Sequence, residues 1–134
     1  MIERVVIEIV RGLEALTRRV AHLEAIEAPG ATLGAPPLLT IASGAITVTR
    51  HFHRVDTEGA AAADDLDTIN GGVAGMLLVL QCQANARVVT VRDNAGNIQL
   101  AGSANCVLNN VYDKLMLIYT PGNRWEEISR ADNA

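Results

Sequence analysis

The sequence predicts a mainly β protein, in which an N-terminal α-helical coiled-coil stalk leads into a β-sandwich or jelly-roll-like knob that assembles as a trimer. Three observations predict it: an apolar heptad repeat at the start of the 134-residue chain, a break rich in proline and glycine, and a series of short β-rich runs that follows. The expected boundaries are residues 1–28 for the helix, 29–37 for the linker and 38–134 for the knob.

Apolar residues in the first segment recur at alternating spacings of four and three. They form one seam, made of Ile2, Val6, Ile9, Leu13, Leu16, Val20 and Leu23. A strict heptad pattern of about three repeats is typical of a coiled coil. Val5 and Val10 widen the seam, and its core positions do not follow the preference of dimers, so a parallel trimer is expected ahead of a tetramer or a dimer. The alternative is a helix that packs on its own β-domain, because such helices carry a similar stripe.

The run EAPGATLGAPPLL ends the helix, because Pro29 cannot continue it and Gly30 and Gly34 weaken it. After it come the β-rich runs LLTIAS, AITVTRHF, MLLVLQCQ, ARVVTVRD, IQLAG, CVLNN, KLMLIYT and RWEEISR. The turn signals DNAGN and PGN predict hairpins between ARVVTVRD and IQLAG and between the last two runs. About eight short strands favour a β-sandwich or jelly-roll-like domain.

Composition limits both the core and the partners. Aromatic residues make up only 3% of the chain, so the core must be aliphatic, and association of copies would bury faces that one chain leaves exposed. A formal net charge of −4 gives no attraction for nucleic acid. No apolar run approaches the ~18 residues of a membrane span, and charged residues interrupt the N-terminal segment, so neither membrane insertion nor a signal peptide is expected.

Two histidines, His51 and His53, lie one residue apart in the expected strand ITVTRHFHRVD. Residues i and i+2 of a strand face the same way, so both imidazoles are expected on one face. Two ligands are too few for a zinc site in one chain, but on a threefold axis the pair could hold a transition metal. Arg50 and Arg54 flank the pair and disfavour a bound cation. The competing interpretation is a polar role at a surface or an interface.

Other chemistry has weaker support. Asp64, Asp65 and Asp67 could bind Ca²⁺ or supply the carboxylates of a glycan hydrolase, but the ligand spacing of an EF-hand is missing, and so is an aromatic sugar platform. A solvated or helix-capping acidic loop is the third interpretation. Cys82 and Cys106 lie in apolar runs, where a buried free thiol behaves as a small hydrophobe. We therefore expect no catalytic residues, and no cofactor beyond the metal considered above.

Four motifs follow one another in the β-rich part: VDTEG at residues 55–59, DLDTINGG at 65–72, GNI at 96–98 and WEEISR at 125–130. In this order they resemble a β-domain that recurs in bacteriophage virion proteins, notably at the C-terminal ends of tail fibres. The resemblance runs from about Ile46 to Arg130. It implies a homotrimeric structural module on the outside of a virus particle, and it implies no catalytic residues.

The expected function is therefore that of a short trimeric fibre or appendage on the virion surface, made in the host cytoplasm. Its expected partners are other copies of itself, other virion proteins of the capsid or tail, and a glycan or protein of the host-cell surface. One alternative is a capsid decoration protein, of the cement or head-fibre kind, that stabilises the shell. The others are a glycan hydrolase of a phage spike and a bacterial trimeric adhesin-like domain.

Overall fold

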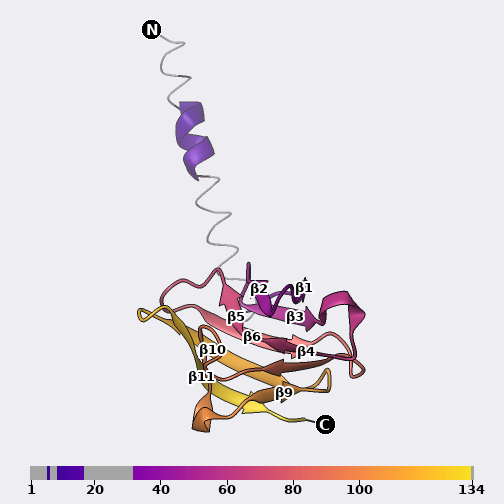
Figure 1. Ribbon diagram of the computed structural model, residues 1–134. Helices are drawn as coiled ribbons and strands as arrows, with labels where there is room; N and C mark the ends of the chain where they lie inside the picture. The colour runs from indigo at the N-terminus through magenta and orange to yellow at the C-terminus, as the bar shows by residue number, and fades with distance from the viewer. Residues whose placement is uncertain (1–5, 7–8, 17–31, 134) are drawn as a thin grey trace. The chain divides into compact units, whose positions relative to one another are not determined.

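The computed structural model describes residue 6, residues 9–16 and residues 32–133 of the chain. The chain divides into two compact units, Met1–Thr32 and Leu33–Ala134. The second unit is a β-domain (Figure 1). Its elements are β1 (Leu38–Thr40), β2 (Ala45–Thr47), β3 (Phe52–Asp56), η1 (Glu58–Ala60), β4 (Ala63–Leu66), β5 (Thr68–Asn70), β6 (Leu77–Cys82), β7 (Val88–Val91), β8 (Ile98–Gln99), η2 (Ala101–Ser103), β9 (Cys106–Leu108), β10 (Lys114–Thr120) and β11 (Arg124–Ala131), where η denotes a 3₁₀ turn.

Residue 6 and residues 9–16 of the first unit are helical, as predicted for this part of the chain. The seam residues among them, Val6, Ile9, Leu13 and Leu16, are 52% to 58% exposed. The remaining seam residues, Ile2, Val20 and Leu23, lie outside the described residues, so the 1–28 helix and its coiled coil stay predictions. Within the described part of the chain, no helix is long and apolar enough to cross a membrane.

The strands of the β-domain form three sheets. Sheet A has six strands in the order β1-β3-β6-β10-β11-β8, sheet B pairs β2 with β5, and sheet C has the order β4-β7-β9. Strands β6, β10 and β11 run side by side in sheet A, and β4 and β9 belong to the opposing layer (Figure 1). The prediction of a mainly β fold is confirmed.

The chain repeatedly leaves sheet A for a strand of sheet B or C and then returns, so neighbouring strands of one sheet often run in the same direction. Among the described strands, five of the eight pairings are parallel and three are antiparallel. A jelly roll is built from antiparallel strands. The jelly-roll-like part of the prediction is therefore wrong.

The two predicted hairpins have different outcomes. Strands β10 and β11 pair antiparallel across the PGN turn, with Thr120 opposite Arg124, as expected. The hairpin predicted at DNAGN is wrong, because β7 belongs to sheet C whereas β8 pairs with β11 in sheet A. The turn itself is present, with the Asn94 amide donating to the Ile98 carbonyl, but it carries the chain from one layer to the other.

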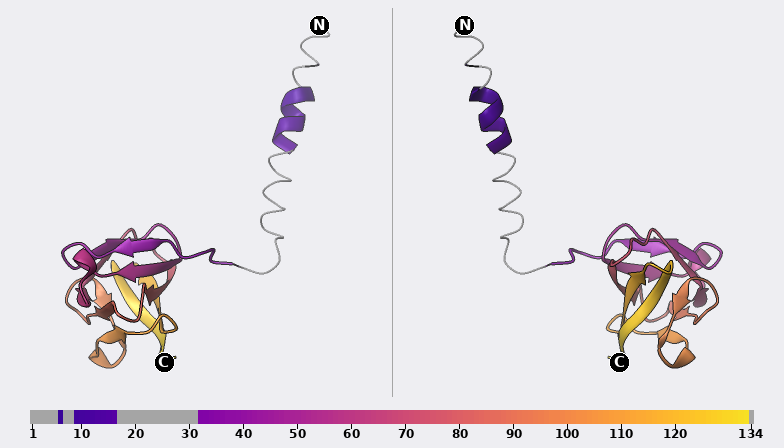
Figure 2. Two further views of the ribbon diagram at one scale, coloured as in Figure 1. Left: turned by 90° about the vertical axis from the view of Figure 1, so that its right-hand side faces the viewer. Right: turned by 90° about the vertical axis from the view of Figure 1, so that its left-hand side faces the viewer.

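The core lies where the inner face of sheet A meets sheets B and C (Figure 2). Trp125 of β11 is completely buried, and its indole N–H donates to the Ile69 carbonyl of β5 at 3.1 Å, which joins sheet A to sheet B. The buried apolar residues are Ile41, Ile46, Val48, Val55, Leu66, Ile69, Leu78, Leu80, Cys82, Val89, Val91, Ile98, Leu100, Cys106, Leu108, Leu115, Leu117 and Trp125. The core is aliphatic, as expected, but one chain completes it without help from other copies.

Candidate functional site

His53 of β3 is completely buried, and the surrounding backbone engages both of its ring nitrogens. The amides of Thr49 and Arg50 donate to Nε2 at 3.1 and 3.0 Å. Nδ1 therefore carries the proton and donates to the Pro37 carbonyl at 3.2 Å. Burial lowers the pKa of His53, and the charge of Arg50 lowers it further, although the bond to Pro37 raises it. This histidine is neutral and holds two chain segments together.

His51 lies in a bend before β3 and is exposed. Its Nδ1 is 2.8 Å from the Leu77 carbonyl. The prediction that His51 and His53 share a strand face is therefore wrong, because the backbone turns inward at Thr49 and Arg50 to reach His53. In this arrangement His53 has no ring nitrogen left for a metal, and the structure does not bring the two imidazoles together as a ligand pair.

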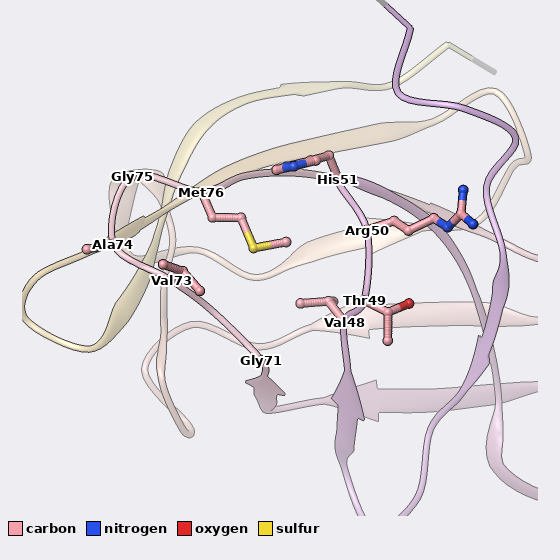
Figure 3. Close-up of a pocket in the computed structure, with 9 residues that line it drawn as sticks. All are labelled: Val48, Thr49, Arg50, His51, Gly71, Val73, Ala74, Gly75 and Met76. Atoms are coloured by element: carbon pink, nitrogen blue, oxygen red, sulfur yellow. The ribbon is translucent and has the colours of Figure 1, made fainter. Parts of the chain in front are cut away.

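An open groove of about 500 Å³ lies beside His51, between the segment that follows β2 and the loop from β5 to β6 (Figure 3). The side chains of Val48, Val73 and Met76 point toward its centre, whereas Arg50 points away from it. Gly71 lets the loop approach closely, because a side-chain carbon there would collide with the Val48 carbonyl. The groove is thus mainly apolar, with one imidazole at its margin.

The acidic residues considered for Ca²⁺ or hydrolysis are engaged within the domain. Both carboxylate oxygens of Asp67 accept from the Arg92 guanidinium, and Asp65 lies 3.3 Å from the same group. The hydrogen bond from Arg92 lowers the pKa of the Asp67 carboxyl group. Asp64 lies in β4 and accepts from the Glu58 amide at 2.7 Å. Within the described part of the chain, no three side chains of His, Cys, Asp or Glu gather around one point.

Both cysteines are buried and lie in strands, as expected from the apolar runs around them. Burial raises the pKa of the Cys82 and Cys106 thiols. A raised pKa leaves less of the nucleophilic thiolate at neutral pH. Both thiols therefore act as core side chains.

The VDTEG and DLDTINGG motifs stabilise the fold. Asp56 binds the Arg87 guanidinium through both carboxylate oxygens at 2.7 Å. The Asn97 side chain clamps the backbone of Ile69, accepting from its amide at 2.9 Å and donating to its carbonyl at 2.8 Å. Gly72 packs against the ring of Tyr119 so closely that a side-chain carbon would collide with it. Each of these contacts joins two segments that are distant in the chain.

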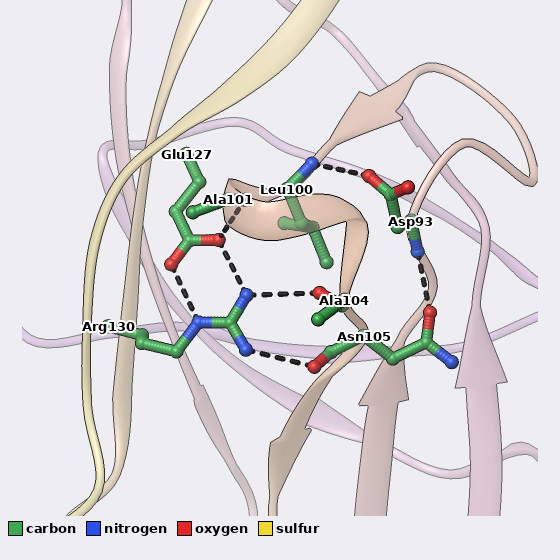
Figure 4. Close-up of polar contacts among 7 residues, drawn as sticks. All are labelled: Asp93, Leu100, Ala101, Ala104, Asn105, Glu127 and Arg130. Carbon is green, nitrogen blue, oxygen red and sulfur yellow. Dashed lines mark hydrogen bonds and ion pairs between the residues drawn. The ribbon is translucent and has the colours of Figure 1, made fainter.

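The closing WEEISR motif fixes the connection between β8 and β9 (Figure 4). Glu127 accepts from the Ala101 amide at 2.8 Å and from Arg130 at 2.7 Å, and Arg130 lowers the pKa of Glu127. Arg130 also donates to the carbonyls of Asn105 and Ala104, at 2.9 and 3.1 Å. The motifs on which the resemblance rests therefore hold together segments that are distant in the chain.

Sequence analysis missed an apolar surface on the outer face of sheet A. Strand register places Phe52, Val79 and Met116 in one row across β3, β6 and β10, and Leu77 beside Ile118 in the next row. Cross-strand partners share a face, and these five residues alternate with the buried core residues of their strands. We call them the outer apolar patch. The signal in the sequence is the absence of polar alternation in LLVL and LMLI.

A scan against protein-family models found no match to this chain, and a search of curated proteins also found none. Functional inference therefore depends on the chain's own residues and surfaces. The two surfaces that stand out are the exposed helix seam and the outer apolar patch.

Proposed function

We propose that this protein is a non-enzymatic structural protein of a bacteriophage particle, a short trimeric appendage in which the helices associate and the β-domain is displayed. The observation that carries the proposal is the exposure of the helix seam, where Val6, Ile9 and Leu16 are 52%, 58% and 55% exposed. Apolar residues at heptad spacing gain stability when they pack between helices.

The β-domain supports this division of roles, because its own core is closed. Leu80, Leu117 and Trp125 are completely buried in one chain, so the domain has no need of the helix seam for its interior. The seam is therefore available for association between copies. A display role fits a domain whose motif residues are used to hold its sheets together.

Displayed in three copies, the domain binds by repetition. Three identical weak contacts to a particle or a cell surface give an avidity that exceeds one contact by roughly 10²–10⁴-fold when all can engage together. This mechanism needs no reaction chemistry in the domain. It needs a stable scaffold that displays an exposed surface, which is the arrangement proposed for this chain.

Light scattering of the full chain tests the association. The expected mass is three times 14.2 kDa. Leu16→Glu puts a charge into the seam and is expected to yield the single-chain mass. Ala15→Glu adds the same charge beside the seam and is the matched control, expected to remain trimeric. A single-chain mass for the unaltered protein would overturn the proposed trimer.

Binding assays test the role of the displayed domain. Fluorescently labelled trimer is expected to bind whole host cells more tightly than it binds capsids emptied of DNA. The reverse preference would favour the capsid decoration protein, and release of sugars from host glycans would favour the hydrolase. The monomeric Leu16→Glu variant is the control, and it is expected to bind at least about 100-fold more weakly because avidity is lost.

A further inference from the structure

We propose that His53 is an acid-sensitive switch, in which protonation of the ring opens the turn at Thr49 and Arg50 and so changes one wall of the groove in Figure 3. The switch belongs to one chain and does not depend on the association of copies, so it goes beyond the proposed function. We call the turn closed when both of its amides are bonded to His53, as they are in the structure.

The bonds around His53 fit the neutral imidazole and not the imidazolium. Nδ1 carries a proton and donates to the Pro37 carbonyl, and the lone pair of Nε2 accepts from the amides of Thr49 and Arg50 at 3.1 and 3.0 Å. The imidazolium has a proton on both nitrogens and no lone pair. A proton on Nε2 would therefore point at two N–H groups, and both amides would lose their acceptor. The closed turn cannot keep this geometry when the ring is charged.

The surroundings of His53 oppose a charge on the closed ring. His53 is completely buried, and Arg50 is the charged side chain that acts on it. Leu80 lies beside His53 in β6, and β1 on the other side contains no titratable residue. The side chains of Arg54 and His51 each contact a backbone carbonyl of another segment. Among the described residues no carboxylate bonds to the ring, so a charged His53 gains solvation only when the turn opens.

The turn is part of the groove. Residues 48–51 line one side of it, and Val73 and Met76 lie on the other side (Figure 3). The amide of Val48 donates to the Asn70 carbonyl, whereas the next two amides along the chain depend on His53. Loss of those two bonds frees the turn directly after Val48, whose side chain points toward the centre of the groove. Opening of the turn therefore exposes Val48 and alters the groove.

Acid favours the open turn. Burial lowers the pKa of His53 in the closed turn, and Arg50 lowers it further, although the bond to Pro37 raises it. In the open turn the ring meets water, and its pKa returns toward the ordinary value of 6.5. The open turn thus takes up a proton more readily. Its population relative to the closed turn rises as the pH falls below 6.5, by at most about tenfold per pH unit.

Labelling of Val48→Cys in the full chain with N-ethylmaleimide tests the switch. Val48 is 4% exposed, whereas Val73 across the groove is 69% exposed. Val73→Cys is therefore the matched control, because it reports how pH changes the reaction of an accessible thiol. The ratio of the Val48→Cys rate to the Val73→Cys rate is expected to rise by about tenfold between pH 7.5 and pH 5. A constant ratio would overturn the proposal.

The native cysteines and a second substitution identify the cause of the rise. Cys82 and Cys106 are buried in strands, and peptide mapping is expected to find them unlabelled. If they react as fast as Val48→Cys, the whole domain opens and a local switch is excluded. Glutamine at residue 53 can donate and accept but does not titrate. His53→Gln is therefore expected to hold the ratio constant, and a rise that survives it would assign the effect to another group and overturn the proposal.

Hydrogen exchange of the unaltered chain provides a second measurement should a variant fail to fold. The amides of Thr49 and Arg50 are expected to exchange faster as the pH falls from 7.5 to 5, after correction for the intrinsic effect of pH. They are also expected to exchange faster than the amides of Leu80 and Leu117 in the central strands throughout this range. Equal rates for all four amides, or corrected rates at Thr49 and Arg50 that do not change with pH, would contradict the switch.

Discussion

The helix and the β-domain place their apolar residues in opposite ways. In the helix, Ile9 is 58% exposed, whereas in the β-domain Leu80 and Trp125 are completely buried. The domain therefore gains its stability from contacts within one chain, while the helix seam gains stability only when something covers it. The difference indicates that folding of the domain and association of copies depend on different residues, which can be altered separately.

The largest effect on the domain is expected from Trp125→Ala. This substitution removes the largest buried side chain, its edge-to-face contact with Tyr119 and its hydrogen bond to Ile69. The free energy of unfolding is expected to fall by about 3–5 kcal/mol, measured by chemical denaturation followed by circular dichroism. Tyr112→Ala, at a site that is 66% exposed, is the control and should change it by less than about 0.5 kcal/mol.

Gly72→Ala is expected to destabilise the domain by about 1–3 kcal/mol, because the added carbon meets the Tyr119 ring and the packing must shift. Thermal unfolding of the full chain measures the effect. Gly122→Ala is a matched control, since the nearest atom to an added carbon there is 3.8 Å away. Equal melting temperatures for the two variants would contradict the tight packing described for the β5–β6 loop.

Acid should weaken the domain through His53. Because burial lowers the pKa of His53, the unfolded chain takes up a proton more readily than the folded domain. The contribution of neutral His53 to the free energy of unfolding is therefore fully present above pH 6.5, the ordinary pKa of histidine. It falls as the pH drops below that value, by at most about 1.4 kcal/mol per pH unit. Urea denaturation between pH 7.5 and pH 5 measures the slope. His53→Gln should flatten the slope, and a slope that survives this substitution would assign it to another group.

Gly12→Ala makes the same change in the helix as Gly72→Ala makes in the domain, with the opposite expected sign. Apart from its chain neighbours and the backbone of its own helix, no atom in the described part of the chain lies within 4 Å of a carbon added at Gly12. Alanine favours the helix by about 1 kcal/mol over glycine, so the helical signal of the full chain and its association should both strengthen. Circular dichroism at 222 nm over a dilution series measures this. A loss of helical signal would mean that the close approach of another chain requires this glycine.

Local patterns in the sequence predicted strand positions better than strand partners. The run KLMLIYT and the PGN turn identified β10 and its hairpin, because both lie close together in the chain. The DNAGN turn was misread, because sheet membership of β8 depends on its pairing with Trp125 and Glu126 of β11, a contact between distant segments. The histidine pair was misread for a similar reason. The rule that residues i and i+2 share a face applies only where the strand is continuous, and β3 begins at Phe52.

The sequence predicted the helix seam but did not predict the outer apolar patch. The heptad spacing identified the helix seam directly, since one element carries the whole pattern. The outer apolar patch is assembled from three strands whose neighbours are distant in the chain, so only their continuous apolar character was visible in the sequence. Pairing partners supply the missing information, because they decide which apolar residues become adjacent.

The separation between folding and association is tested most directly by the Leu16→Glu variant, followed by light scattering and fluorescence on the same eluting peak. Trp125 is the chain's one tryptophan and lies in the domain core, so its emission reports on that core alone. We expect a mass of 14.2 kDa with emission unchanged from the unaltered chain. A red-shifted emission in that peak would contradict it, because the domain would then depend on association to fold.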